Sequence, residues 1–323
     1  MTIHTQDAKL DNDYFTVAFY NLENLFDIFD DPKTYDNDFL PKSKRNWNAK
    51  RYHKKSRKLG QVISQIGLKK TNKPPVLIGL AEVENRLVVD DLINSSSLKD
   101  KQYDLVHFDS PDERGIDVAL IYHKEYFEVI TSKVFALDLF DADGTRDYTR
   151  DILLVEGFLN GEKIYVLVNH WPSRRAGVEL TEPARIIASN KAIEIITSIK
   201  KRDINAKIIV KGDFNDNPKN DSITNLVESH NLYNPMSNLP TYARGSLNHR
   251  KEWNLFDQIL FTTNFFEYSE GKHSFSQVDI FDEDFLKQYR GKYKGNPFRT
   301  YAGYIYKGGF SDHFPVYLFL KKS

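Results

Sequence analysis

The sequence predicts a mixed α/β protein, and three observations lead to this prediction. Short apolar segments rich in β-branched and aromatic residues recur along the chain, as they do in buried strands. Two longer segments carry apolar residues at helical spacing. Neither a low-complexity linker nor a repeat of fixed period interrupts them. We therefore expect a single domain over residues 15–323, preceded by an N-terminal tail at residues 1–14.

Eight apolar segments are predicted to be strands. In chain order these are residues 15–20, 76–82, 115–122, 152–158, 164–169, 207–210, 256–261 and 315–320. The segments at 76–80 and 207–210 are apolar on both faces, which is typical of central strands in a sheet that is covered on both sides.

Helical periodicity is clearest in two segments, 49–67 and 182–200. On one face they carry Tyr52, Leu59, Val62, Ile63 and Ile66 in the first, and Ile186, Ile193, Ile196 and Ile199 in the second. Thr181 and Pro183 are a plausible start for the second helix. Shorter helices are expected at 88–97 and near 222–230.

Two segments, 28–48 and 263–310, lack periodicity and are rich in polar and aromatic residues. They are predicted to be long loops. Such loops often line or cover an active site. A surface excursion without a role is an equally good interpretation of each loop taken alone.

Composition excludes several classes of protein. The chain of 323 residues is long enough to fold without disulfides or a structural metal. It has no cysteine, which excludes disulfide scaffolds, thiolate zinc sites and cysteine nucleophiles. Lysine plus arginine equals aspartate plus glutamate at 45 each, so contact with nucleic acid requires a local basic patch.

Targeting and membrane signals are not visible in the sequence. The first residues do not combine a basic segment with an apolar one. No apolar run approaches the ~18 residues of a membrane span. A cytoplasmic location is the default expectation, and secretion replaces it if a signal peptide lies upstream of this chain.

Five clusters place polar residues at the ends of apolar strands, where layered α/β folds bind ligands. Their polar members are Asn21, Glu82, His170, Asp213 with Asn215, and Asp312 with His313. Oxygen ligands without thiolates favour Mg²⁺ or Mn²⁺. Carboxylates and imidazoles beside such a metal suit hydrolysis of a phosphate ester.

Each of these residues also has a purely structural interpretation. Glu82 could begin a helix, Asp213 and Asn215 could form a turn, His313 could be a buried core histidine, and Asn21 could cap a strand. Each interpretation is simple by itself. All five clusters together would require several coincidences, so the combination favours an active site.

Seven motifs carry a resemblance to a known family. In chain order they are YNLENLF, GLAEVEN, RGIDVALIY, VNHWPSR, GDFND, WNLFDQIL and GGFSDHFPV. Together they resemble the endonuclease/exonuclease/phosphatase superfamily over about residues 15–320, in its bacterial DNase-like branch. Its members include DNase I, exonuclease III-type nucleases, sphingomyelinases and inositol-polyphosphate phosphatases. The resemblance implies a four-layer α/β/β/α sandwich of two packed, mostly antiparallel sheets.

The resemblance also implies a role for each matching residue. Asn21, Glu82 and Asp312 match metal-site residues, and the metal is expected to be Mg²⁺ or Mn²⁺. Asp213 matches the residue that positions or deprotonates the attacking water. The remaining catalytic positions match Asn215, His170, His313 and Asp257, of which Asp257 orients His313.

Two arginines and two departures from the family pattern complete the expected site. Arg114 and Arg174 are expected to bind phosphate oxygens, with surface ion pairs as the alternative. Glu23 is the nearest match to an acid that many nucleases carry after the first asparagine, but its register is uncertain. Asp117 stands where relatives have a small residue, so it replaces a phosphate-binding amide or pairs with an arginine.

The expected substrate is DNA, cleaved by an endonuclease that requires no obligate protein partner. A basic stretch, 50–58, lies on the first predicted helix, with Trp47 and Tyr52 near it to stack on bases. A solvated helix face explains the same stretch. A weaker basic patch contains Lys292, Lys294 and Arg299. The alternatives are hydrolysis of a small or lipid phosphate ester, and a non-catalytic relative that binds phosphate or protein.

Overall fold

Two six-stranded sheets form the body of the protein, which the computed structural model describes over residues 12–141, 143–239 and 242–323. The first sheet contains, in spatial order, β15 (His273–Ile280), β18 (Val316–Lys322), β1 (Tyr14–Leu25), β2 (Leu77–Val83), β4 (Asp117–His123) and β3 (Tyr103–His107). The second contains β11 (Leu232–Tyr233), β14 (Asp257–Thr262), β10 (Lys207–Asp213), β9 (Glu162–His170), β8 (Ile152–Leu159) and β5 (Phe127–Phe135).

Both sheets follow the same pairing pattern. Each has one parallel pair near its centre, β1 with β2 or β9 with β10. The other neighbours in each sheet are antiparallel. A parallel pair points two carboxyl-terminal strand ends in one direction, so each sheet delivers two such ends to the same rim.

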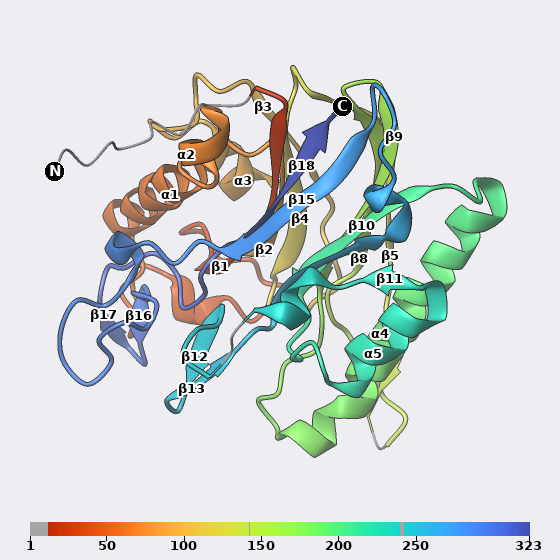
Figure 1. Ribbon diagram of the computed structural model, residues 1–323. Coiled ribbons are helices and arrows are strands. Elements are labelled where there is room, and N and C mark those ends of the chain that lie inside the picture. Colours follow the sequence, from red (N-terminus) through yellow and green to blue (C-terminus); the bar gives the residue numbers. More distant parts are fainter. Residues whose placement is uncertain (1–11, 142, 240–241) are drawn as a thin grey trace, which may run out of the picture.

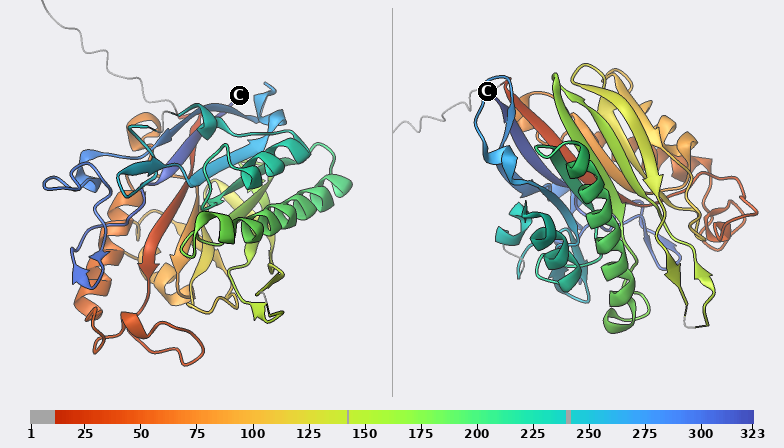
Figure 2. Two further views of the ribbon diagram at one scale, coloured as in Figure 1. Left: turned by 90° about the horizontal axis from the view of Figure 1, so that it is seen from below. Right: turned by 90° about the vertical axis from the view of Figure 1, so that its right-hand side faces the viewer.

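Helices cover the outer face of each sheet, which completes the four layers (Figure 1). On the first sheet lie α1 (Ala49–Ile63), α2 (Leu68–Thr71) and α3 (Arg86–Ile93). On the second lie α4 (Val178–Arg202) and α5 (Asp221–His230). The turned views in Figure 2 show the same order of layers. The mixed α/β sandwich of two packed sheets is therefore confirmed.

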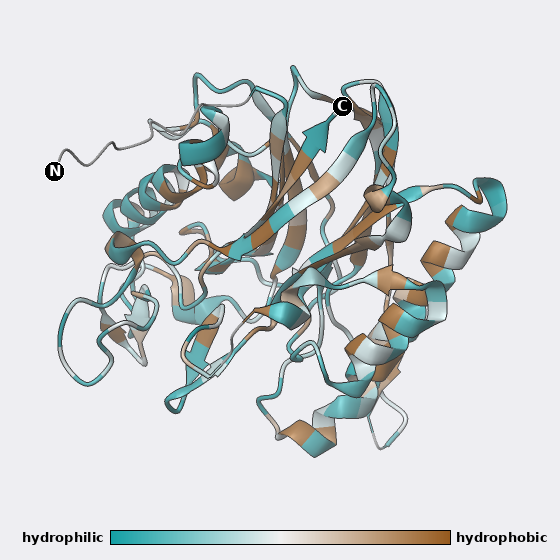
Figure 3. Cartoon of the chain, viewed as in Figure 1, coloured by the Kyte–Doolittle hydropathy of each residue, from teal (hydrophilic) through white to brown (hydrophobic). Residues whose placement is uncertain are grey.

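The main core lies between the two sheets, and Gly79 shows how closely they pack. A Cβ atom at Gly79 on β2 would lie 2.9 Å from the ring of Phe19 and 3.1 Å from a methyl group of Val168 on β9. Only a residue without a side chain fits this gap. Apolar residues accordingly fill the strands while the outward faces of the helices are largely hydrophilic (Figure 3).

All eight predicted strands are present, but the ends of the predicted helices shift. The first helix stops at Ile63 instead of residue 67, and a turn that contains Gly67 with a φ of +73° follows it. The helix expected at 182–200 already begins at Val178 and has Pro183 inside it. The shorter predicted helices correspond to α3, which ends at Ile93, and to α5.

The loop predicted over 263–310 is partly wrong, because β15 lies inside it and forms an edge strand on β18. Its half-buried residues alternate irregularly, which hid the strand in the sequence. Segment 28–48 does lack long regular structure and contains one short 3₁₀ turn, Asn37–Phe39. Of the predicted N-terminal tail, residues 1–11 lie outside the described residues.

Three short hairpins lie outside the large sheets: β6 (Leu139–Phe140) with β7 (Arg146–Asp147), β12 (Leu247–His249) with β13 (Glu252–Asn254), and β16 (Tyr301–Ala302) with β17 (Ile305–Tyr306). Over the described ranges, the helices are all too short or too polar to cross a membrane.

A buried ionic cluster joins the two sheets at the end where β1 starts. The carboxylate of Glu162 on β9 accepts hydrogen bonds from the backbone N–H of His273 on β15 (2.7 Å), and its other oxygen lies 2.8 Å from Lys207 Nζ. The His273 ring nitrogen Nδ1 also lies 2.7 Å from the carboxylate. Burial alone would raise the pKa of Glu162, but these hydrogen bonds lower it to about 2.

We expect Glu162→Gln to destabilise the protein in a pH-dependent way. The pKa of Glu162 falls from 4.5 to about 2 on folding, so its stabilisation is present above pH 4.5 and disappears as the pH falls toward 2. The loss at neutral pH should be at most about 3 kcal/mol. Urea unfolding of both proteins at several pH values measures it, and a difference that stays constant with pH would contradict this account.

Candidate active site

The polar residues predicted from the strand ends do converge on one rim. Asn21 Nδ2 on β1 donates to Asp213 Oδ2 on β10 at 3.0 Å and lies 3.5 Å from Glu82 Oε1 on β2. Asp213 pairs with His170 along the parallel ladder and with Asp257 along the antiparallel one. Asn21 and Asp213 belong to different sheets, so the packing of the two sheets brings groups that are 192 residues apart in sequence within hydrogen-bonding distance.

Irregularities of the backbone set the direction of the side chains at Glu82, Glu23 and Asn24. Glu82 has a φ of +60° and sits at a register shift between β2 and β4. Glu23 and Asn24 have φ values of +52° and +55° at a shift between β1 and β2. The backbone N–H of Asn24 donates to Glu82 Oε2 at 2.8 Å. Positive φ at three non-glycine residues marks local strain, which is typical of functional sites.

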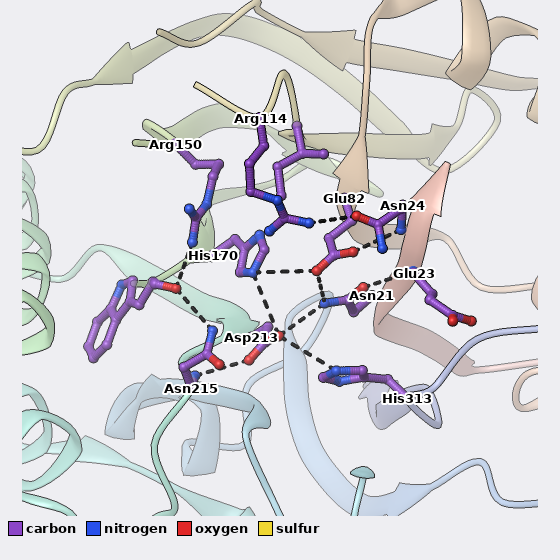
Figure 4. Close-up of polar contacts among 12 residues, drawn as sticks. Asn21, Glu23, Asn24, Glu82, Arg114, Arg150, His170, Asp213, Asn215 and His313 are labelled. Carbon is purple, nitrogen blue, oxygen red and sulfur yellow. Dashed lines mark hydrogen bonds and ion pairs between the residues drawn. The ribbon is translucent and has the colours of Figure 1, made fainter. Parts of the chain in front are cut away.

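Two histidines flank Asp213 (Figure 4). Nε2 of His170 and Nε2 of His313 lie 3.8 Å and 3.9 Å from the same oxygen, Asp213 Oδ2. Nδ1 of His313 lies 2.7 Å from Asp257 Oδ2, as the sequence predicted for its orienting carboxylate. The Asp257 contact fixes the ring so that Nε2 faces the centre of the site.

Electrostatics give the two histidines different protonation states. Burial alone would lower the pKa of His313, but the Asp257, Asp213 and Asp312 carboxylates raise it well above its ordinary value. Burial lowers the pKa of His170 far below its ordinary value, and the nearby guanidinium of Arg150 lowers it further. His313 is therefore cationic at neutral pH, while His170 is neutral and acts through hydrogen bonds.

The hydrogen bonds and the pKa of Asp213 suit it to accept a proton or to orient a water molecule. Its Oδ1 accepts the backbone N–H of Asn215 at 3.0 Å, and its Oδ2 accepts from Asn21. Burial, together with the Asp257 carboxylate, raises the pKa of Asp213 to about 7. Such a carboxylate is better matched to general base chemistry at neutral pH than an ordinary aspartate is.

Asn215 points its side-chain amide at the protein backbone. Its Nδ2 donates to the carbonyl oxygen of Trp171 at 3.0 Å, and this carbonyl also accepts from Arg150 Nη2 at 2.8 Å. Asn215 has a φ of +51°, another left-handed conformation at this rim. In this structure Asn215 therefore fixes the loop after β10 and the backbone end of β9.

The two predicted phosphate-binding arginines differ in their surroundings. Arg114 Nη2 donates to Asn24 Oδ1 at 2.6 Å, and the residue borders the cavity next to Glu82. Arg174 directs its donors into the protein: Nε donates to Asn215 O at 2.6 Å, and Nη2 contacts Asp216 and Asn220. Arg174 thus stabilises the loop after β10, and Arg114 is the better placed of the two for a phosphate.

These groups line an open cavity of about 930 Å³. Its wall includes the predicted site residues except Asn21 and Asp257, which lie buried behind it, together with arginines that the sequence analysis did not assign to the site. Four of these lie at its border: Arg45, Arg175, Arg250 and Arg299. A fifth missed arginine, Arg150, is buried beside His170 and pairs with Asp112 at 3.0 Å. Arginines scattered over the loops leave no motif in the sequence, so only the folded structure reveals them.

The basic helix differs from its predicted role. Lys55 is only 2% exposed, and its Nζ donates to the carbonyl oxygen of Glu23 and to Thr300 Oγ1. Trp47 and Tyr52 are 0% and 4% exposed, so the prediction that they stack on bases is wrong. Both rings are buried because Tyr52 lies on the apolar face of α1 and Trp47 lies in the segment just before this helix. Lys50 and Lys54 do remain exposed.

Glu23 is not directed at the Glu82–Asp213 centre (Figure 4). Its carboxylate accepts the backbone N–H groups of Thr300 (2.5 Å) and Tyr301 (3.3 Å), and Arg299 Nε lies 3.4 Å away. Arg299 also contacts Asp312 at 2.7 Å. Burial raises the pKa of Glu23 to about 7. Glu23, Lys55 and Arg299 thus clamp the segment that leads to Asp312 and His313.

We expect Lys55→Met to destabilise the protein much more than Lys54→Met. Removing the buried ammonium group leaves two buried oxygens without their donor, a loss of about 2 kcal/mol. The exposed neighbour should cost less than about 0.5 kcal/mol. Urea unfolding at equal ionic strength compares the two variants. Equal stabilities would show that the Lys55 contacts contribute nothing.

The oxygen donors at the rim fit a hard divalent cation. Glu82 presents a carboxylate at the cavity, the buried amide of Asn21 lies 3.5 Å behind it, and the chain has no thiolate to compete. Asp312 borders the same cavity, but the contact that the structure gives its carboxylate is with Arg299. Asp213, Asp257 and His313 also offer ligand atoms within 4.8 Å of one another.

Asp117 does not pair with an arginine. Its carboxylate lies 2.9 Å from His107 Nε2 and accepts the backbone N–H of Ser110, also at 2.9 Å. His107, Asp109 and Asp117 form a second group with metal-ligand spacing, although Asp109 is exposed. The contacts of Asp117 fix the loop that carries Arg114.

Comparison with known proteins agrees with this fold. The sequence model of the Endonuclease/Exonuclease/phosphatase family matches residues 16–322, so the chain belongs to this phosphoesterase family. No curated protein matches the sequence significantly. The predicted membership is thus confirmed over nearly the whole chain.

Solved structures share the fold at low sequence identity. A Bacteroides thetaiotaomicron endonuclease/exonuclease/phosphatase family protein superimposes with a TM-score of 0.59 at 16% identity, covering 96% of this chain and 95% of its own. A mannosyl-6-phosphatase from the same organism gives 0.59 at 16%, covering 95% and 99%. D. rerio TDP2 complexed with a single strand DNA product gives 0.56 at 12%, covering 96% and 99%.

Proposed function

We propose that the protein is a divalent-metal-dependent phosphodiester hydrolase that acts as a nuclease on DNA. The observation that carries the proposal is the arrangement around Asp213 Oδ2, with one cationic and one neutral histidine 3.9 Å and 3.8 Å away and Asn21 joining it to Glu82. Hydrolysis of a phosphodiester needs an oriented water, a base and positive charge on the developing phosphorane. Here Asp213 can both orient the water and act as the base, and His313 can supply the positive charge.

The proposed roles follow from the contacts of each group. Asp213 orients the attacking water and accepts its proton. The His313 imidazolium stabilises negative charge on the phosphorane, while His170 donates a hydrogen bond to a phosphate oxygen. Arg114 binds another phosphate oxygen. Asp257 and Asn215 act as positioning residues for His313 and for the loop beside Asp213.

Glu82 and Asn21 would hold Mg²⁺ or Mn²⁺, with Asp312 near them. The chemistry that such a cation supplies when bound is neutralisation of charge on the phosphate oxygens. The carboxylate, amide and imidazole groups described here are compatible with that requirement, because they leave an oxygen-lined edge of the cavity.

DNA is favoured as the substrate by the arginine-rich border of the cavity and by the TDP2 structure with its single strand DNA product. A phosphatase acting on a small phosphate ester is the second candidate. The observations that favour it are the zero net charge of the chain and the fold shared with a mannosyl-6-phosphatase.

A substrate panel separates the two candidates. Plasmid DNA, single-stranded DNA, RNA, bis-p-nitrophenyl phosphate, p-nitrophenyl phosphate and mannose 6-phosphate are each incubated with EDTA, Mg²⁺ or Mn²⁺. Metal-dependent loss of DNA and of the diester supports the proposal. Turnover of the monoesters alone would favour the phosphatase. Hydrolysis that persists in EDTA would contradict metal dependence.

A further inference from the structure

A second, smaller cavity of about 230 Å³ adjoins the active-site cavity. The two share five lining residues: Asn24, Phe39, Arg45, Arg114 and Arg175. The small cavity is large enough for more than ordered water, whose share of volume is about 30 Å³ per molecule. It therefore continues the active site in one direction, past Arg114 and away from His313.

One wall of this second cavity is the exposed ring of Tyr35, which is 73% exposed. The loop that carries it is fixed in place: the backbone N–H of Tyr35 donates to the Glu113 carbonyl at 2.7 Å. Thr34 packs on Gly115, where a Cβ would come within 2.9 Å of its side chain and φ is +68°. In the part of the chain that the structure describes, no aromatic ring stacks on Tyr35, so this exposed ring on a fixed backbone can serve as a stacking platform.

The cavities meet at Arg175, an exposed arginine for which the described part of the chain offers no hydrogen bond or ion pair. Burial is the main cause of the lowered pKa of His170, and the positive charges of Arg150, Arg114 and Arg175 lower this pKa further. Arg114 is itself repelled by Arg175. Like charges held this close are stabilised by a bound anion.

Arg45 is a second cationic residue in the wall of the small cavity. The guanidinium of Arg45 lies 5.0 Å from the centre of the Phe39 ring and 5.4 Å from that of Tyr301. Its Nη1 donates to Gly303 O at 2.6 Å, which ties segment 28–48 to the β16–β17 hairpin. Arg45 Nε also lies 3.4 Å from the carboxylate of Asp38, which lines the same cavity and offsets the charge of Arg45. The cavity thus combines the exposed ring of Tyr35, the guanidinium of Arg175 and the Arg45–Asp38 ion pair.

We propose that this second cavity is a subsite for one unpaired nucleotide next to the scissile phosphate. Its base stacks on Tyr35, and its phosphate binds Arg175. A base inside a duplex cannot stack on a protein ring, so the subsite selects single-stranded nucleic acid or unpaired ends over intact duplex. This inference rests on the proposed function, since it names the form of nucleic acid that the same site accepts.

Binding in EDTA tests the subsite without hydrolysis. A short fluorescein-labelled oligothymidylate and a blunt duplex are titrated with the intact protein, and fluorescence anisotropy gives both Kd values. We expect tighter binding of the single strand. Tyr35→Ala should weaken single-strand binding about tenfold, since one stacked base contributes ~1–3 kcal/mol. Arg175→Ala should reduce the dependence of log Kd on log salt concentration by about 0.7.

A matched control and a second readout make the result decisive. Tyr268→Ala removes a tyrosine that is 80% exposed and lies in the segment beside the C-terminal end of β18, away from the cavity. This variant should bind single strands as the unaltered protein does. If Tyr35→Ala keeps its single-strand Kd within about twofold, or loses the same factor on duplex, the subsite is overturned.

Cleavage assays with Mg²⁺ report separately on the proposed function. Strong single-strand binding through Tyr35 without cleavage of any nucleic acid would contradict the nuclease but support the subsite. Cleavage of DNA with no effect of Tyr35→Ala on binding would support the nuclease and overturn the subsite. Inhibition by mannose 6-phosphate but not by oligothymidylate would assign the cavity to a sugar phosphate and overturn it as well.

Discussion

Replacing His313 with alanine is expected to lower kcat for bis-p-nitrophenyl phosphate about 100-fold or more, because groups that stabilise transition-state charge typically contribute at least this much. The Asp257 contact at 2.7 Å and the 3.9 Å distance to Asp213 place the imidazolium at the centre of the site. The variant also leaves the buried carboxylate of Asp257 without its partner, so a loss of stability is expected beside the loss of activity. Steady-state kinetics and thermal unfolding of the same preparation measure both effects.

The control for this variant is His53→Ala, which removes an exposed histidine from α1. It should retain the kcat of the unaltered protein. If His313→Ala keeps more than about a tenth of the activity, the charge-stabilising role is excluded. If activity and folded structure are lost together, Asp257→Asn provides a second test, because it keeps the shape of the pair and changes only the charge that holds the ring.

The strands and the motif residues could be predicted because their signals are local. A strand such as β10 is apolar on both faces and ends in the GDFND motif, so the position of Asp213 at a sheet rim follows from a few adjacent residues. Asn21, Glu82 and His313 are recognisable in the same way. Their meeting point then follows from the two parallel pairs, which bring the strand ends of both sheets together.

The remaining site residues depend on packing between distant segments, which no local pattern records. Lys55 stands among other lysines on α1 and resembles a surface residue, yet the segment 299–312 covers it. Arg174 stands four positions after the histidine of its motif, but the loop after β10 takes up its hydrogen-bond donors. Arg175, the next residue, makes no hydrogen bond or ion pair within the described ranges, although both arginines line the cavity. The tertiary structure thus decides which of two adjacent guanidinium groups is available to a ligand.

The strained backbone at Glu82 connects folding to the expected metal chemistry. Its φ of +60° at the shift between β2 and β4 turns the carboxylate toward Asn21 instead of along the sheet. A glycine would adopt this conformation more easily, so the position retains a carboxylate at a conformational cost of about 1 kcal/mol or more. That cost is consistent with a functional requirement at this position, because the fold alone would favour glycine.

Glu82→Gln should therefore weaken the divalent cation site while leaving the fold intact. The amide keeps the shape of the side chain and its hydrogen bond from the Asn24 N–H, but it removes the negative charge that a hard cation requires. We expect the Mn²⁺ concentration for half-maximal activity to rise about tenfold or more, and calorimetric Mn²⁺ affinity to fall in parallel. Glu270→Gln, an exposed change of the same chemistry, should alter neither. An unchanged Mn²⁺ titration would remove Glu82 from the metal site, and would leave the Asp213–Asp257–His313 group as the place to look for the ion.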